Sequence, residues 1–253
     1  MKNISILGCG WLGEPLAISL LEAGYSVKGS TTTESKLATL EASQIEAYLI
    51  DIAEFEEYDA FLNTAILIIA ITSKDIDAFE SLIAQIEDSS IQKVIFISST
   101  SVYPYSNCVV TEATKTKEVP LVEIEELFRQ NNCFETTILR FAGLFGGERH
   151  PGNWFSDGRK IPQPNGYVNM IHQEDCIEII HEIIDQNCWD ITLNACADHH
   201  PTRKEFYAIA KLCKDLTLPE FEKNEPLRYK IVSPKKLQNV LGYEFIHNDL
   251  LSI

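Results

Sequence analysis

Basic residues are scarce in this chain of 253 residues. It holds 21 Lys and Arg against 37 Asp and Glu, which gives a formal net charge of -16 at pH 7. Because affinity for DNA or RNA depends on basic side chains that neutralise phosphates, this balance excludes nucleic acid as an expected partner. An anionic small molecule would have to be held locally, by a helix N-terminus or by a few placed basic side chains.

Long hydrophobic runs are also missing. The longest, Ala65 to Ile71, is far too short to cross a bilayer. At the N-terminus, Met1-Lys2-Asn3 leads into a short apolar stretch without the long apolar core and cleavage site of a signal peptide. We therefore expect a soluble, cytoplasmic protein with no membrane partner.

Cysteine pairs of the C-x-x-C type do not occur. The seven cysteines are odd in number and scattered, so we expect neither a metal centre nor a disulfide framework. A nucleophilic cysteine is the alternative, although buried thiols that act as small hydrophobic side chains fit the pattern better. The seven are Cys9, Cys108, Cys133, Cys176, Cys188, Cys196 and Cys213.

Strand-like and helix-like segments alternate over the first half of the chain. Apolar, β-branched runs predict strands at Ile4–Leu7, Tyr25–Gly29, Ile45–Ile50, Ala65–Thr72, Lys93–Ser98 and Glu135–Arg140. Helical apolar spacing occurs at Pro15–Ala23, Glu34–Glu41, Asp77–Ile86 and Leu121–Gln130. This alternation implies parallel strands joined by right-handed crossovers, and so an α/β fold with a Rossmann-type doubly wound parallel sheet.

The pattern changes between residues 146 and 167, where Gly, Pro and polar residues predict a long loop of the kind that is usually functional. Helical spacing returns at Gln173–Asp185 and Thr202–Asp215, with a strand at Asp190–Ala195. We predict that residues 146–253 form mainly a small C-terminal substrate-binding lobe, with some segments returning to the sheet.

A glycine motif, Gly8-Cys9-Gly10-Trp11-Leu12-Gly13, has the spacing G-x-G-x-x-G. In such a loop the first glycine permits a tight turn, the second lets the backbone approach a pyrophosphate, and the third allows helix and strand to pack closely. Because the motif directly follows a strand and opens a helix, it predicts that residues 1–145 form an NAD(P)-binding domain. The alternative is a glycine turn that binds no nucleotide.

The end of the second strand decides between NAD and NADP. An acidic residue there would bind a free ribose 2′-hydroxyl, and a basic one would bind a 2′-phosphate; neither is present. The hydroxyls between Gly29 and Thr33 favour NADP weakly. Asp51 either accepts from the adenine amino group or closes its strand. The predicted cofactor-binding residues are Gly8, Gly10, Trp11, Leu12, Gly13, Ser30, Thr31, Thr32, Asp51, Ala70 and Ser98.

The segment Ile97 to Pro104 looks like the Ser-Ser-x-x-Val-Tyr-Gly stretch of extended short-chain dehydrogenase/reductases, the NAD-dependent epimerase/dehydratase group. The resemblance continues at Leu139–Gly146, Val168–Asp175 and Leu193–Ala195, and with the glycine loop it covers nearly the whole chain. Matched to the family, Ser99 falls where the catalytic Ser/Thr would bind the reacting oxygen of the substrate, and Thr100 follows it.

The family's Tyr-x-x-x-Lys pair is absent. The positions expected to hold it are occupied by Lys117 and Leu121. A Tyr-x-x-x-Lys does occur at Tyr207 and Lys211, but its place in the C-terminal lobe favours two helix residues one turn apart. The chain is therefore similar to the atypical branches of the family, several of which bind the cofactor without a known reaction.

Another group must then move the proton, and the candidates are Tyr103, Lys117 and His172. For Tyr103 we favour packing at the strand end. The resemblance places His172 and Asp175 where the sheet meets the substrate lobe, and for His172 a structural hydrogen bond is the favoured interpretation.

Two functions are consistent with these features. The first is an oxidoreductase or epimerase that acts on a hydroxylated small molecule such as a nucleotide sugar. The second is a non-catalytic NADP(H)-binding sensor or scaffold. Under the first, the basic loop residues Arg149, Arg159 and Lys160 would meet an anionic substrate; the alternative is a solvated loop. A homodimer is left open.

Overall fold

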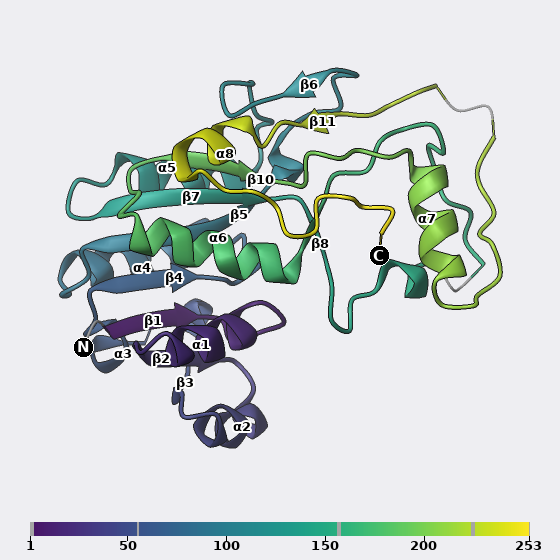
Figure 1. The fold of residues 1–253 in the computed structure, drawn as a ribbon. Helices are drawn as coiled ribbons and strands as arrows, with labels where there is room; N and C mark the ends of the chain where they lie inside the picture. The colour runs from purple at the N-terminus through teal and green to yellow at the C-terminus, as the bar shows by residue number, and fades with distance from the viewer. Residues whose placement is uncertain (1–2, 55, 156–157, 224–225, 253) are drawn as a thin grey trace. The chain divides into compact units, whose positions relative to one another are not determined.

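The computed structural model describes residues 3–54, 56–155, 158–223 and 226–252. Its main sheet has seven strands in the order β10-β7-β5-β4-β1-β2-β3 (Figure 1). Strands β3, β2, β1, β4 and β5 pair in parallel in that sequence. The strands are β1 (Asn3–Leu7), β2 (Ser26–Thr31), β3 (Glu46–Leu49), β4 (Ile66–Ile69), β5 (Lys93–Ser99), β7 (Glu135–Phe141) and β10 (Thr192–Ala195).

Eight helices are described, along with short 3-10 turns that include η1 (Glu34–Lys36) and η3 (Thr100–Val102). Two pairs of short strands lie outside the main sheet: β6 (Val109–Val110) with β11 (Ile231–Val232), and β8 (Gly143–Phe145) with β9 (Met170–His172). The helices are α1 (Gly13–Glu22), α2 (Leu37–Ala42), α3 (Asp59–Leu62), α4 (Ile76–Glu87), α5 (Pro120–Gln130), α6 (Gln173–Asp185), α7 (Arg203–Leu212) and α8 (Lys235–Leu241).

Alternate residues of each strand point to opposite faces of the sheet, and helices cover both faces. Leu7 and Phe96 pack into a core with α4 and α5, where Phe96 stacks on Phe128 at 4.9 Å between ring centroids. Ile6, one residue from Leu7, instead faces the start of α1 at Gly13. This arrangement confirms the predicted doubly wound α/β fold.

The chain forms two compact units. Unit 1 runs to Ser98 and also contains Glu118–Leu139 and Ile180–Thr192. Unit 2 contains Ser99–Lys117, Arg140–Ile179 and the chain from Leu193 onward. These units and the predicted boundary at residue 145 divide the chain differently, since the segment after β5 falls in unit 2 and the end of α6 falls in unit 1.

Candidate functional site

The glycine loop of unit 1 follows β1 and leads into α1. Gly8 adopts a φ of 102°, and a Cβ there would lie 2.7 Å from Ile71 Cγ2 and 3.1 Å from the backbone oxygen of Ala70. A Cβ on Gly13 would overlap the backbone oxygen of Gly8. Both positions therefore require glycine for the loop to close between strand and helix.

Gly10 differs from its two neighbours in the motif. It is exposed, and a Cβ built on it would meet no atom within 4 Å. The loop beside it is fixed by Gly8 N, which donates to Ser30 Oγ at 2.9 Å, and by Cys9 N, which donates to Ser30 O at 2.7 Å. No side chain of the described residues caps the start of α1. A rigid, open backbone at an uncapped helix N-terminus is suited to a phosphate group.

The end of β2 presents hydroxyl groups and one lysine that the sequence did not single out. Thr32 is exposed, and Thr31 Oγ1 accepts from Thr33 N at 3.1 Å. Lys36, in η1, donates to Cys9 O at 2.6 Å and forms an ion pair with Glu14 at 2.7 Å. Lys36 lies in the short turn that follows β2, a few residues beyond the strand end where a basic residue was expected.

The remaining predicted cofactor residues of unit 1 occupy different surroundings. Ala70 N donates to Leu7 O at 2.8 Å, which extends the β1–β4 ladder. The exposed Asp51 accepts from Ala53 N at 3.1 Å. Ser98 is buried and donates to Glu125 Oε1 at 2.5 Å. Within the motif, Leu12 is buried and Trp11 is half-buried.

Cys9, inside the glycine motif, is a buried thiol. Burial raises its pKa to about 12. It is therefore protonated at neutral pH and is not a nucleophile.

In unit 2, Ser99 is the last residue of β5 and Thr100 begins the turn that follows. Ser99 is half-buried, and its hydroxyl accepts from Ser101 N at 3.1 Å; Thr100 is buried. Tyr103 is also buried: its hydroxyl donates to Asn194 Oδ1 at 2.8 Å and accepts from Arg140 Nη1 at 2.7 Å. Burial raises the pKa of Tyr103. With both hydrogen-bonding directions occupied, this hydroxyl is placed to anchor the turn.

Lys230 is a residue of this site that sequence reasoning missed. Its Nζ donates to Thr100 O at 2.7 Å and to Tyr103 O at 2.8 Å. Its side chain is buried, and burial together with the charge of Lys117 lowers its pKa to about 8. Lys117 is exposed, and its backbone N donates to Val102 O at 2.8 Å.

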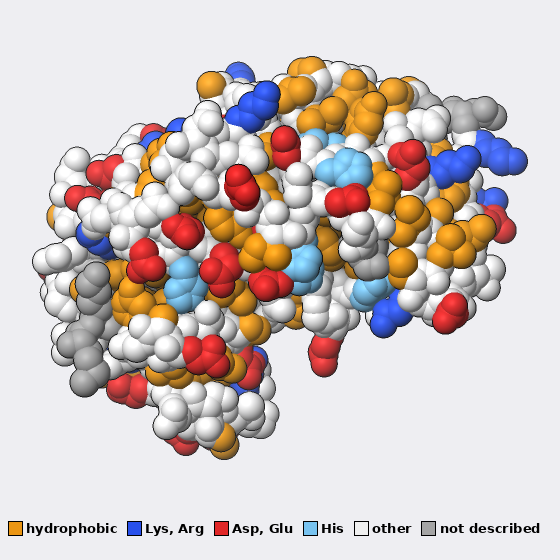
Figure 2. All heavy atoms as spheres, in the orientation of Figure 1, with side chains coloured by type: hydrophobic (Ala, Val, Ile, Leu, Met, Phe, Trp, Pro, Cys, Tyr) orange, Lys and Arg blue, Asp and Glu red, His pale blue; other side chains and the backbone are white. Residues whose placement is uncertain are grey.

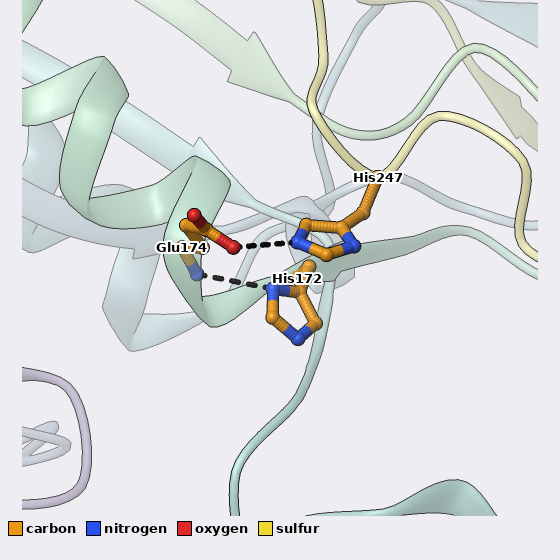
Figure 3. A group of neighbouring side chains, drawn as sticks. All are labelled: His172, Glu174 and His247. Atoms are coloured by element: carbon orange, nitrogen blue, oxygen red, sulfur yellow. Dashed lines mark hydrogen bonds and ion pairs between the residues drawn. The ribbon is translucent and has the colours of Figure 1, made fainter.

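His172, at the end of β9, lies in a cluster with Glu174 and His247 (Figure 3). Its Nδ1 accepts from Glu174 N at 3.2 Å, and His247 Nε2 lies 2.7 Å from Glu174 Oε2. The possible ligand atoms of the three residues lie within 4.8 Å of one another. The ring centroids of His172 and His247 lie 3.7 Å apart, with their planes tilted by 38°.

Three histidines of unit 2 should make stability depend on pH. Burial and the charge of His247 lower the pKa of His172, and burial also lowers the pKa of His150 and His200. The folded chain thus binds fewer protons than the unfolded chain below the ordinary histidine pKa of about 6.5. The stabilising contribution is complete above that pH and is lost as the pH falls. We expect the free energy of unfolding, measured with urea, to decline from pH 7.5 to 5.5.

The matched variant for this prediction is His172→Gln, which keeps a polar side chain but cannot titrate. Its free energy of unfolding should decline less steeply over the same range than that of the unmodified chain. Equal slopes for the two proteins would show that His172 is not a source of the pH dependence.

The predicted substrate-binding residues are exposed in unit 2. Lys160 forms an ion pair with Glu220 at 2.9 Å, and the Arg159 guanidinium lies 6.0 Å from the Phe155 ring centroid. Arg149 N donates to Gly146 O at 3.0 Å in a tight turn.

Acidic side chains are spread over the face of the molecule drawn in Figure 2, as the net charge implies.

The Tyr-x-x-x-Lys of α7 is part of a core. Tyr207 is buried against Phe155, Phe206 and Trp154, and burial raises its pKa. Lys211, one turn along the helix, is also buried.

Residues 3–124 match the sequence model of the NAD binding domain of 6-phosphogluconate dehydrogenase. Among solved structures, a functionally unknown conserved protein from Silicibacter pomeroyi superposes with a TM-score of 0.84 at 19% identity, covering 100% of this chain and 96% of that one. UDP-glucuronic acid 4-epimerase from Bacillus cereus, solved with NAD, gives a TM-score of 0.78 at 14% identity, covering 99% and 95%. The chain has a Rossmann-type α/β fold, and its N-terminal part matches an NAD binding domain.

A curated relative gives a narrower assignment. Protein YeeZ of Escherichia coli strain K12 is 32% identical over 270 residues, which cover 99% of this chain and 98% of that protein. The chain belongs to the YeeZ family. None of the helices in its described residues combines the length and the apolar character needed to span a membrane.

Proposed function

We propose that this chain is an NAD(P)-dependent oxidoreductase or epimerase that acts on a hydroxylated substrate such as a nucleotide sugar. The observation that carries the proposal is the glycine loop, in which Gly8 and Gly13 admit no side chain while Gly10 leaves open space above an uncapped helix. The Bacillus cereus epimerase, whose structure contains NAD, has the same fold and supports this assignment.

In the proposed reaction, the glycine loop, Ser99 and a proton-transfer residue have separate roles. The backbone of the glycine loop would hold the cofactor phosphates, and bound NAD(P) would supply hydride transfer at its nicotinamide ring. Ser99 would orient the reacting oxygen of the substrate with its hydroxyl. The phenol of Tyr103 is occupied by Arg140 and Asn194, so proton transfer is left to Lys117 or His172.

For the cofactor we propose a preference for NADP. No carboxylate ends β2, the hydroxyl of Thr32 is exposed there, and Lys36 lies one turn further along. Lys36→Gln should weaken NADP binding about tenfold, which corresponds to about 1.4 kcal/mol. NAD binding should weaken less, because NAD has no 2′-phosphate and would be affected only through the contact of Lys36 with the loop at Cys9 O. Titration calorimetry with both cofactors measures this. Equal losses for both, or tighter binding of NAD by the unmodified chain, would contradict the preference.

Catalysis is tested by incubating the chain with NAD(P) and UDP-sugars. Absorbance at 340 nm follows net hydride transfer, and chromatography of the sugars follows epimerisation, in which the reduced cofactor is reoxidised within the cycle. Turnover that is lost in Ser99→Ala supports the enzyme. The second candidate, a non-catalytic sensor, is favoured by the occupied phenol of Tyr103. It predicts cofactor binding with neither signal for any sugar.

A further inference from the structure

Two lysines meet at one turn of unit 2. The turn is η3 at the carboxyl end of β5, directly after Ser99. The side chain of Lys230 binds the backbone oxygens of Thr100 and Tyr103, and the backbone of Lys117 binds that of Val102. In open α/β sheets the carboxyl ends of the strands are where ligands bind.

Besides its two carbonyl contacts, the Lys230 ammonium lies over the rings of Tyr103 and Tyr105, and these contacts supply no negative charge. In the part of the chain that the structure describes, neither lysine forms an ion pair with a carboxylate. The charge acting on Lys230 is that of Lys117, which has the same sign. Burying an ammonium group is unfavourable, and a nearby second cation makes it more so. Such an arrangement is stabilised when an anion binds.

The Lys230 side chain also retains capacity for a ligand. An ammonium group has three N–H donors, and two are used by the carbonyl oxygens of the turn. Lys117 makes no side-chain hydrogen bond among the described residues and extends from an exposed position. Beside them the ring of Tyr105, which is 71% exposed, lies 5.5 Å from Lys230 Nζ and offers an apolar face.

We propose that Lys117 and Lys230 form a binding site for an anionic oxygen group of the substrate, a phosphate or a carboxylate, next to Ser99. The proposal rests on the proposed function, because it names the residues that would bind the anionic group of the proposed substrate. In this site Lys230 supplies a buried, oriented N–H and Lys117 supplies a second charge. The exposed ring of Tyr105 packs against the sugar or other apolar part of the same molecule.

The test uses inorganic phosphate and, in a second arm, acetate, titrated calorimetrically into the full chain at constant ionic strength without cofactor. Lys117→Gln should weaken binding of the preferred anion at least tenfold without lowering the melting temperature, because the substitution removes a like charge beside Lys230 and no described side-chain contact. Lys115→Gln, an exposed lysine two residues away, is the matched control and should bind as the unmodified chain does. Both variants keep the glycine loop, so any anion binding there contributes equally to the two titrations and does not affect the difference between them.

Equal anion affinity in Lys117→Gln and Lys115→Gln would overturn the site, as would the absence of anion binding to the unmodified chain. The anion that binds more tightly, phosphate or acetate, shows whether the site prefers a phosphate or a carboxylate group. Lys230→Met is a second variant with the same expected loss; if it fails to fold, Lys117→Gln still decides. Because the titration needs neither cofactor nor turnover, a chain that binds the anion but turns over no sugar contradicts the proposed function alone.

Discussion

Gly10→Val should abolish detectable NAD(P) binding while the chain stays folded. The added atoms extend into space that no other atom of the free protein occupies within 4 Å of the Cβ. We therefore expect the free energy of unfolding to change by less than about 1 kcal/mol. The same space is where a pyrophosphate approaches the backbone, so cofactor affinity should fall at least about 100-fold, or about 2.7 kcal/mol. Calorimetric titration and urea unfolding measure the two quantities.

Gly13→Ala is the matched comparison, because it adds a smaller side chain within the same motif. Its Cβ would overlap the backbone oxygen of Gly8, which cannot move aside as a flexible side chain could. We expect a loss of about 1–3 kcal/mol in the free energy of unfolding without any cofactor. The interpretation of the loop fails if Gly10→Val binds NAD(P) normally, or if Gly10→Val destabilises the free chain as much as Gly13→Ala does.

The glycine loop and the sheet could be predicted because their signals are local. The motif spans Gly8 to Gly13, and β5 is a continuous β-branched run that reads as buried on both faces. The short ladders could not be predicted. β6 and β11 have two residues each, at Val109–Val110 and Ile231–Val232, and two residues carry no periodicity.

Lys230 shows why the site was harder to predict than the fold. It contacts the backbone of Thr100, 130 residues earlier, through carbonyl oxygens whose positions depend on the chain path rather than on residue type. Asn169 helps to set that path, since its side chain donates to Lys230 O at 3.0 Å and accepts from Val232 N at 2.7 Å. Neither the contact of Lys230 nor those of Asn169 could be predicted from the composition of the sequence or from the spacing of its residues.

Tyr103 illustrates the opposite case, in which a residue type suggests chemistry and its surroundings determine a different role. A tyrosine near Ser99 is a reasonable proton donor by type. Its hydroxyl, however, lies between Arg140 and Asn194 in a buried network that also includes Glu112, whose carboxylate accepts from Asn194 N at 2.8 Å. Only the tertiary structure brings these four residues together.

Asp175→Ala should produce a large loss of stability. The carboxylate is fully buried and accepts from Tyr243 Oη at 2.8 Å, Ile246 N at 2.7 Å and His247 N at 3.1 Å. Its removal would leave one buried and two part-buried donors without their acceptor and would remove these three contacts between α6 and the C-terminal segment. Since each unsatisfied group costs about 1–3 kcal/mol, we expect a total loss of about 3–5 kcal/mol in the free energy of unfolding.

Glu174→Ala is the control for this prediction, because Glu174 is the neighbouring carboxylate but is exposed and contacts His247 from outside. Its loss should stay below about 1 kcal/mol. Asp175→Asn has nearly the same side-chain shape and keeps one acceptor oxygen, so its loss in the free energy of unfolding should lie between the losses of the other two variants. It also supplies a measurable variant if Asp175→Ala does not fold. Urea unfolding gives all three values. Equal losses for Asp175→Asn and Glu174→Ala would mean that the charge and second oxygen of Asp175 contribute little, and that the C-terminal segment is held mainly by its apolar contacts.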